Sequence, residues 1–315
     1  MLIADDITAL ERWGEPRLVW RLGEPVSPPA DWSPTIDEVT DEEALREAGF
    51  EASVDRPIHV LVERRERRIR SPRVVSHVWS GPFPDGALYQ LTPRVMIASP
   101  SFCLQQMSAR RGIVKAIVTA MEICGEYTRS PRAKDGLYRR PPLATPEELR
   151  DHFSGTHGYG AKCARAALRH VIPGSRSPME TVVVLLFTLP VKLGGCGLPP
   201  PRLNMRIEIP GDLQNAIGKP YVVVDLCWFD QRIILEYDSY EWHTLPRAVD
   251  SDNTRNEGLR DEEWMVRSVT AGMLADDAMR RHLVSKVVGR FGRKLPEGEE
   301  FDQLQHNLVQ ELLRA

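Results

Sequence analysis

The 315-residue sequence predicts an α/β protein in which a mixed sheet flanked by helices follows a smaller α+β domain. Two observations lead to this fold class. In the C-terminal half, periodic patterns follow one another in the order helix, three strands, helix, strand, helix. In the N-terminal half, short β-type runs separated by proline and glycine turns precede a helical segment. A strand meander completed by a strand that returns through a helix gives a mixed sheet.

Four parts of the chain differ in composition. The first fifty residues are acidic and rich in proline, so we expect a loosely ordered segment with one short helix at 41–48, capped by Thr40. The stretch 128–146 is rich in proline, arginine and lysine and is the predicted linker. The predicted parts are an acidic N-terminal segment (1–50), a basic α+β module (51–145), the larger α/β domain (146–298) and a C-terminal helix (299–315).

The individual elements follow from local patterns. In the basic module, IHVLV and RVVSHVW read as strands and 100–126 as helix, and two further helical segments cover 146–153 and 159–170. Ser177 begins a helix with Pro178 at its first position and Glu180 three residues on, which is the pattern of a capping box. After it we predict strands at 203–209, 221–228, 232–237 and 264–270 and helices at 250–263 and 275–293.

Composition limits the location and the partners of the protein. The five cysteines are widely spaced and indicate free thiols in a reducing compartment. No apolar stretch reaches the roughly 20 residues that span a bilayer, and the N-terminus has no signal pattern. We therefore predict a cytoplasmic protein without a membrane partner.

The formal net charge of −3 hides a basic region after residue 50. Its densest run belongs either to a solvated strand or loop face or to a surface that contacts phosphates. The arginines that we treat as candidate nucleic-acid contacts in this run are Arg64, Arg65, Arg67 and Arg68.

Three carboxylates lie in the stretch VDLCWFDQRIILEYDSYEWH, from Val224 to His243. Side chains two apart in a strand face the same side, so Glu236 and Asp238 project together. The hairpin through 229–231 places Asp225 across from Glu236. Three anionic groups at one point repel each other unless a cation lies among them, and Mg²⁺ or Mn²⁺ takes oxygen ligands of this kind. For each acid taken alone, the alternative is a solvated residue or one paired with an arginine.

The order and spacing of several motifs resemble the very-short-patch-repair-like branch of the PD-(D/E)XK nuclease superfamily. The motifs are SPMET, GLPPPRLNMRI, VVVDLCW, RIILEYDSYEWH, VDSDNTRNEGL and EEWMVRSVT, which span about residues 175–274. The resemblance implies a restriction endonuclease-like fold for 146–298 and a magnesium- or manganese-dependent endonuclease that hydrolyses DNA, in phage defence or in DNA repair.

Residue roles carry over from the resemblance position by position. Asp225 and Glu236 would be metal ligands and catalytic residues, and Glu180 an outer metal ligand. Asp238 would be a further catalytic acid that orients the water or helps to hold the metal. Arg255 would either contact a phosphate or pair with Asp252 or Asp238 to support the site. Arg280 and Arg281, on the last predicted helix of the domain, would either contact the DNA backbone or form a solvated face.

The sequence departs from the superfamily at the position of its signature lysine, two residues after Glu236, where Asp238 stands. Ser239 replaces the glycine that usually follows. His243 is then the candidate for proton transfer, because an imidazole has a pKa of about 6.5. Its alternative role is that of a packed structural residue beside Trp242.

The N-terminal half, from IHVLVERRERRI to GEYTR, is similar to a region in bacterial proteins related to abortive-infection antitoxins. This similarity implies DNA and a cognate toxin or defence protein as partners and indicates no particular oligomeric state. It also leaves a second hypothesis open, a catalytically inactive nuclease fold that acts as a DNA-binding or antitoxin-like regulator. The apolar stripe of the C-terminal helix predicts either a partner-binding surface or packing on its own domain; its residues are Phe301, Leu304, Leu308 and Leu312.

Overall fold

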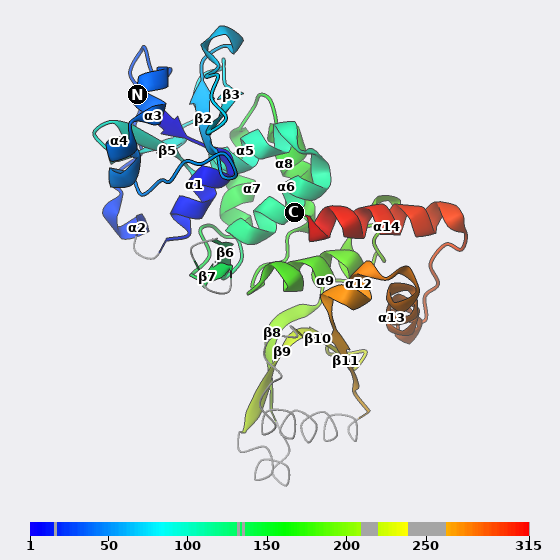
Figure 1. The fold of residues 1–315 in the computed structure, drawn as a ribbon. Helices are drawn as coiled ribbons and strands as arrows, with labels where there is room; N and C mark the ends of the chain where they lie inside the picture. The colour runs from blue at the N-terminus through cyan, green and yellow to red at the C-terminus, as the bar shows by residue number, and fades with distance from the viewer. Residues whose placement is uncertain (16–17, 131–132, 134–135, 209–219, 239–262, 315) are drawn as a thin grey trace. The chain divides into compact units, whose positions relative to one another are not determined.

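The computed structural model describes residues 1–15, 18–130, 133, 136–208, 220–238 and 263–314. The chain divides into two compact units, Met1–Val171 and Ile172–Ala315, and each has a mixed sheet flanked by helices (Figure 1). The predicted α/β class is therefore confirmed. No helix in the described part of the chain is long and apolar enough to cross a membrane, and all five cysteines are free.

The first unit is built on a five-stranded sheet in the order β3-β2-β1-β5-β4. The central strand β1 runs antiparallel to β2 and parallel to β5. β2 pairs in parallel with β3, and β4 is antiparallel to β5. Two further strands, β6 and β7, form a separate hairpin. The strands are β1 (Leu2–Ala4), β2 (Ile58–Val62), β3 (Val74–Val78), β4 (Leu88–Thr92), β5 (Val95–Ala98), β6 (Tyr127–Arg129) and β7 (Leu137–Arg139).

Helices cover this sheet. Val39 and Leu45, on two short helices, join one apolar cluster with residues of β1, β2, β3 and β5, and the first helix packs against β2 and β5. The predicted helix at 100–126 is two helices, which separate at Gly112 with its positive φ of 79°. The helices are α1 (Asp6–Trp13), α2 (Leu18–Arg21), α3 (Ile36–Thr40), α4 (Glu42–Glu47), α5 (Pro100–Arg110), α6 (Gly112–Ile123), α7 (Pro146–Gly155) and α8 (Ala161–Ala167).

The prediction that residues 1–50 are loosely ordered is wrong. β1 lies in the centre of the sheet with all three residues buried, and α3 and α4 add apolar residues to the core. The acidic composition did not indicate this order, because the same segment carries apolar residues that are buried in the core, among them Leu2, Val39 and Leu45. The predicted helix at 41–48 is α4, but Asp41 rather than Thr40 caps it, accepting from the backbone N–H groups of Glu43 and Ala44.

The predicted linker at 128–146 is also wrong, since it contains most of the β6–β7 hairpin. Arg140 is buried there, and its guanidinium donates to the carbonyls of Glu122 and Gly125 at 2.9 and 3.1 Å. Arg140 thus satisfies backbone acceptors instead of facing solvent. The unit boundary falls between Val171 and Ile172, so α7 and α8 belong to the first unit and not to the domain predicted from residue 146.

The second unit follows the predicted order closely in its described residues. Its sheet has the order β11-β10-β9-β8, with β8, β9 and β10 antiparallel in turn and β10 parallel to β11. The strands are β8 (Arg202–Glu208), β9 (Tyr221–Trp228), β10 (Ile233–Tyr237) and β11 (Met265–Val269). The predicted helix at 250–263 lies outside the described residues.

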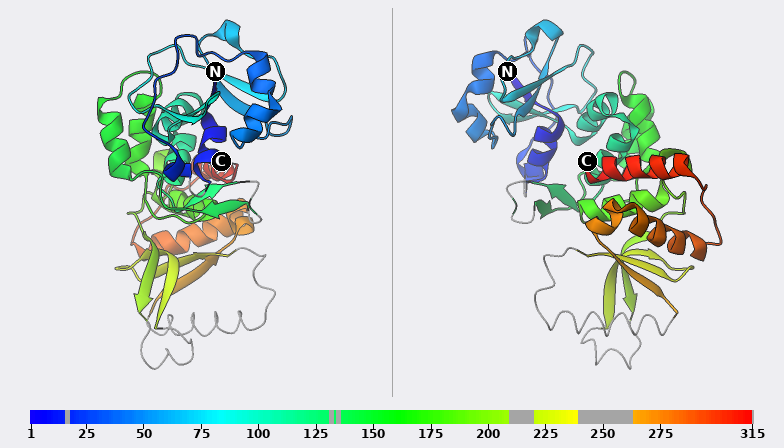
Figure 2. Two further views of the ribbon diagram at one scale, coloured as in Figure 1. Left: turned by 90° about the vertical axis from the view of Figure 1, so that its left-hand side faces the viewer. Right: turned by 45° about the vertical axis from the view of Figure 1, so that its right-hand side comes forward.

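Among the described residues of this unit, four helices accompany the sheet, and they lie together above its strands in both views of Figure 2. α9 packs against β9 and β10, where Phe187 meets Trp228 edge-to-face at 5.8 Å. α14 packs on α9 and buries Phe301, Leu308 and Leu312, so most of its stripe serves its own unit. The helices are α9 (Pro178–Thr188), α12 (Ala271–Ala275), α13 (Asp277–Arg290) and α14 (Glu299–Leu313).

Candidate functional site

Asp225 and Glu236 lie on the paired strands β9 and β10. The ladder pairs Trp228 with Ile233 and Leu226 with Leu235, and one more step sets Asp225 opposite Glu236. The Oδ2 atom of Asp225 accepts a hydrogen bond from the backbone N–H of Tyr237 at 2.8 Å. Both carboxylates are only partly buried. The hairpin thus brings these two acids together as its sequence pattern predicts.

Glu180 approaches this pair from the first turn of α9. Ser177 caps the helix by accepting from the backbone N–H of Glu180 at 3.1 Å. The Oε2 atom of Glu180 accepts from the backbone N–H of Arg176 at 2.8 Å, whereas a capping box would engage that of Ser177. Burial raises the pKa of Glu180, and the negative charge of Asp225 raises it further. The carboxyl groups of Glu180 and Asp225 are therefore electrostatic neighbours.

Asn204 completes this group, and the sequence reasoning missed it. It stands in β8 between Leu203 and Met205, which pair with Leu226 and Val224, so it lies across from Asp225. Its φ of 49° is unusual for a residue other than glycine and is more often tolerated by asparagine. An asparagine within a strand pattern was the available signal, because asparagine is depleted in strands.

The side-chain amide of Asn204 connects three neighbours. Nδ2 donates to Oε2 of Glu180 and to the carbonyl of Gly174, both at 2.9 Å. Oδ1 accepts from Nη1 of Arg176 at 3.1 Å. Both amide hydrogens and the oxygen are therefore used, which holds the Glu180 carboxylate in one orientation.

The remaining predicted site residues of the second unit have different positions. Asp238 follows β10 directly, and its backbone N–H donates to the carbonyl of Val269, which ties the end of β10 to β11. His243 and Arg255 lie outside the described residues. Arg281 is exposed and pairs with Asp302 at 3.1 Å.

Arg280 does not form a DNA-facing surface, contrary to the prediction. Its side chain is 2 % exposed and turns inward. Its guanidinium donates to the carbonyl of Leu274 at 2.8 Å and pairs with Asp277. The arginine thus satisfies the carbonyl of a residue in α12, an acceptor that burial would otherwise leave unpaired.

The oxygen donors of the second unit suit a hard divalent ion in part. Mg²⁺ is usually bound by one or two carboxylates and keeps several water ligands. Asp225 and Glu236 could supply the two carboxylates. In the described part of the chain, the side chains of Asp6, His59 and His77 place their ligand atoms within 4.8 Å of one another. Glu180, Asp225 and Glu236 do not form such a group. The structure therefore does not bring the three predicted metal ligands within direct coordinating distance of one point.

The arginine run of the first unit lies on the connection between β2 and β3, which includes the short 3₁₀ turn Arg65–Arg67. Figure 1 shows this connection projecting from the end of the two strands. The predicted contact residues are all exposed, and they make no ion pair within the described part of the chain; they are Arg64, Arg65, Arg67 and Arg68.

Comparisons with known proteins name two relatives and no activity. Two proteins of Mycobacterium tuberculosis, "Uncharacterized protein Rv2248" of strain H37Rv and "Uncharacterized protein MT2308" of strain CDC 1551, are each 28 % identical over 195 residues. The alignment covers 61 % of this chain and 64 % of each relative, so it spans less than two thirds of their length. No family model matches the chain, and no solved structure matches it.

Proposed function

We propose that the second unit is a restriction endonuclease-like domain that hydrolyses phosphodiester bonds of DNA with the help of a divalent metal ion. The observation that carries this proposal is the meeting of Asp225 and Glu236 on paired strands with Glu180 and Asn204 beside them. A core that only needed burial gains nothing from such a group, because like charges brought together in a partly buried place cost free energy.

The residues of this group would have distinct roles. Asp225 and Glu236 would hold Mg²⁺ or Mn²⁺, which would lower the pKa of a bound water and offset negative charge on the phosphate. Glu180 would orient water bound near the ion, since Asn204 and the backbone of Arg176 hold its carboxylate. Asp238, at the end of β10, would accept a hydrogen bond from the attacking water.

The test is cleavage of supercoiled plasmid with Mg²⁺ or Mn²⁺ by the full chain. Asp225→Asn and Glu236→Gln keep side-chain size and remove charge, so we expect each to lower the cleavage rate by on the order of 100-fold or more. Asp230→Asn is the matched control, because Asp230 is an exposed acid in the turn of the same hairpin. Absence of metal-dependent cleavage by the native chain, or equal loss in the control, would refute the enzyme.

DNA binding without cleavage is the second candidate function, and the exposed arginines between β2 and β3 favour it. Asp238 in place of the superfamily's lysine also removes a cation from the site. Under this proposal the native chain would shift DNA in a gel, whether or not Mg²⁺ is present, and would not cut it. A cognate toxin or defence protein would then be the partner that the bound protein regulates.

A further inference from the structure

Three potential metal ligands meet in the first unit, whereas the carboxylate group described above belongs to the second unit. His59 lies on β2 and His77 on β3, offset by two residues in the parallel ladder, so their side chains face the same side of the sheet. Asp6 lies where β1 passes into α1. The backbone N–H of Asp5 donates to the carbonyl of His59 at 3.0 Å, which holds β2 beside that junction.

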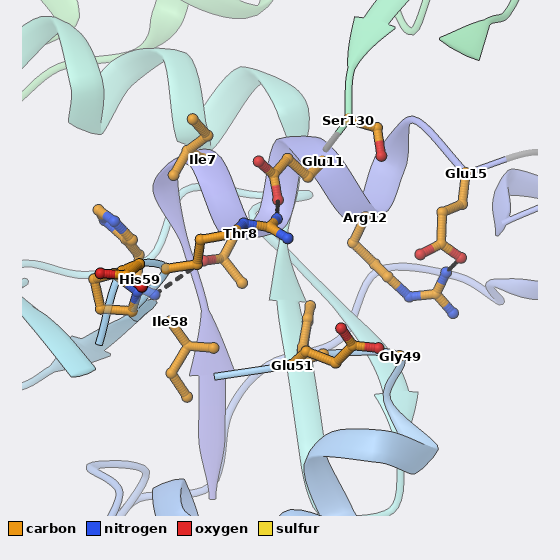
Figure 3. Close-up of a pocket in the computed structure, with 14 residues that line it drawn as sticks. Ile7, Thr8, Glu11, Arg12, Glu15, Gly49, Glu51, Ile58, His59 and Ser130 are labelled. Atoms are coloured by element: carbon orange, nitrogen blue, oxygen red, sulfur yellow. Dashed lines mark hydrogen bonds and ion pairs between the residues drawn. The ribbon is translucent and has the colours of Figure 1, made fainter. Parts of the chain in front are cut away.

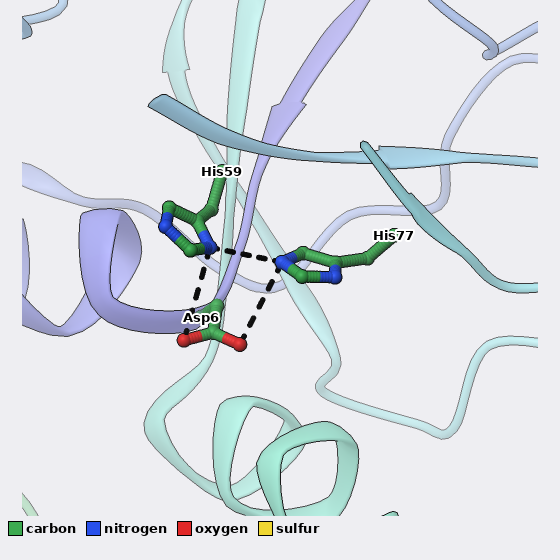
Figure 4. A group of neighbouring side chains, drawn as sticks. All are labelled: Asp6, His59 and His77. Carbon is green, nitrogen blue, oxygen red and sulfur yellow. Dashed lines mark hydrogen bonds and ion pairs between the residues drawn. The ribbon is translucent and has the colours of Figure 1, made fainter. Parts of the chain in front are cut away.

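The donor atoms of the three side chains point toward one another (Figure 4). Nδ1 of His59 and Nε2 of His77 are 2.9 Å apart. Oδ1 of Asp6 lies 4.0 Å from the first nitrogen, and Oδ2 lies 3.7 Å from the second. An ion with bonds of about 2.0–2.1 Å permits its ligand atoms to be separated by at most about 4.2 Å. These three separations fall within that limit when both oxygens of the Asp6 carboxylate are used. With one ligand atom from each residue, the three atoms lie within 4.8 Å of one another.

The surroundings favour the ligand forms of these groups. The Asp6 side chain is fully buried, and those of His59 and His77 are 14 % and 12 % exposed. Two imidazole nitrogens and a carboxylate that are shielded from bulk water form a donor set of the kind that transition-metal ions prefer. Asp6 also has a φ of 55°, a strained conformation of the type that is concentrated at functional sites.

Two arginines contact the same carboxylate. Nη2 of Arg110 donates to Oδ2 of Asp6 at 2.7 Å, and Nη2 of Arg111 donates to Oδ1 at 2.6 Å. Each carboxylate oxygen has two lone pairs, so it can accept from a guanidinium and still bind an ion. Such outer contacts orient a metal ligand, although the two positive charges weaken its affinity for a cation.

A neighbouring pocket offsets part of that positive charge. It has a volume of about 260 Å³, and His59 is one of its lining residues (Figure 3). Four carboxylates line it against two arginines, Arg12 and Arg56. A cleft lined mainly by negative charge raises the local concentration of cations. The acids are Glu11, Glu15, Glu51 and Asp55.

We propose that Asp6, His59 and His77 bind one transition-metal ion, for which Zn²⁺ is the best match to two imidazoles and a carboxylate. Three protein ligands leave a fourth position of a tetrahedral zinc site for water or for a small molecule. Mg²⁺ prefers oxygen ligands and does not compete effectively for nitrogen. This site is therefore chemically distinct from the carboxylate group of the second unit and does not depend on the nuclease proposal.

Calorimetric titration of the EDTA-treated full chain with ZnCl₂ in excess Mg²⁺ tests the site. We expect about one zinc per chain, and a loss of affinity of at least 10-fold in His59→Gln and His77→Gln. His157→Gln is the matched control because His157 is an exposed histidine of the same unit, and it should bind as the native chain does. Asp225→Asn should also bind normally, which separates this site from the proposed nuclease centre.

Two results would overturn the proposal: no zinc binding by the native chain, or unchanged affinity in both histidine variants. In either case the three residues form only a hydrogen-bond network. If a variant fails to fold by circular dichroism, titration of the native chain with Co²⁺ decides. Visible bands of nitrogen-ligated Co²⁺ together with paramagnetic shifts of the assigned His59 and His77 ring signals support the site, and their absence refutes it.

Discussion

Two titratable residues in the first unit have opposite effects on stability as the pH changes. Burial raises the pKa of Asp5 from 3.8 to about 7, and burial lowers that of His77 from 6.5 to about 3. Between about pH 4 and 6.5, Asp5 keeps its proton in the folded chain but is ionised in the unfolded chain, so raising the pH destabilises the fold. Over the same range His77 is protonated in the unfolded chain but neutral in the folded chain, so raising the pH stabilises the fold. The two contributions therefore nearly cancel.

Removing one residue of this pair should reveal the contribution of the other. Relative to the native chain, Asp5→Asn should make the free energy of unfolding rise with pH by about 1.4 kcal/mol per unit between about pH 4 and 6.5. His77→Gln should make it fall by a similar amount. Urea denaturation at several pH values in EDTA measures both slopes. Variant profiles parallel to the native one would contradict the prediction.

Asn204 illustrates how one side chain supports both the fold and the candidate site. Asn204→Ala removes its hydrogen bonds to Glu180, Gly174 and Arg176 and should lower the free energy of unfolding by about 1–3 kcal/mol. Asn204→Gly removes the same bonds, but glycine tolerates the φ of 49°. The free energy of unfolding of this variant should therefore be about 1 kcal/mol higher than that of Asn204→Ala.

Chemical denaturation of these two variants beside Asn307→Ala measures this difference. Asn307 is an exposed asparagine on α14 that bonds only to Gln303 among the interactions described, so its loss should cost less than about 0.5 kcal/mol. A glycine variant less stable than the alanine variant would contradict a strained backbone at this position.

At the level of elements, α14 is an integral part of the second unit. Leu308 is 3 % exposed where α14 packs on α9, whereas Leu304 on the same helix is 36 % exposed. Leu308→Ala should therefore lower the free energy of unfolding by about 2–5 kcal/mol, and Leu304→Ala by less than about 1 kcal/mol. Urea unfolding of the two variants measures the difference. Equal effects would point to a helix that binds a partner through its stripe.

The β9–β10 hairpin is the element in which sequence and structure agree most closely. The alternation of apolar residues predicts both strands, and β9 has the predicted bounds, Tyr221–Trp228. A short turn then sets the register, because Arg232 N–H bonds to the carbonyl of Phe229 at 3.0 Å. Local chemistry alone therefore brings Asp225 opposite Glu236.

At the level of the whole molecule, charge is unevenly distributed although the net charge is small. Replacing the four exposed arginines of the β2–β3 connection by alanine should weaken DNA binding. The plot of log affinity against log salt concentration should also become less steep, by about 0.9 for each phosphate that the arginines neutralise in the native complex. The variant is Arg64→Ala with Arg65→Ala, Arg67→Ala and Arg68→Ala.

The control has the same change in charge but removes arginines of the same unit that already pair with acids. Their partners are Glu11, Glu42, Asp41 and Glu147. Gel shifts at several salt concentrations should show a smaller effect for this control than for the exposed set, and equal effects would indicate attraction by net charge alone. The control replaces Arg56, Arg73, Arg94 and Arg150 by alanine.

By itself the sequence determined the α/β class, the strands and, except for the short helix α12, the helices described in the second unit, and the pairing of Asp225 with Glu236. Each depends on hydrophobic periodicity, capping or a short turn, and these act within a few residues. The tertiary structure alone decided that β1 is a central strand, that α7 and α8 belong to the first unit, and that Arg280 is buried.

The tertiary structure also decided which distant side chains meet. Glu180, Asn204 and Asp225 come from a helix and two strands, and Asp6, His59 and His77 from a helix start and two strands. Their encounter depends on sheet order, register and packing between segments far apart in the chain. Those contacts form only when the whole core closes, because the entropy lost in joining remote segments is repaid by burial across the unit and not by any local pattern.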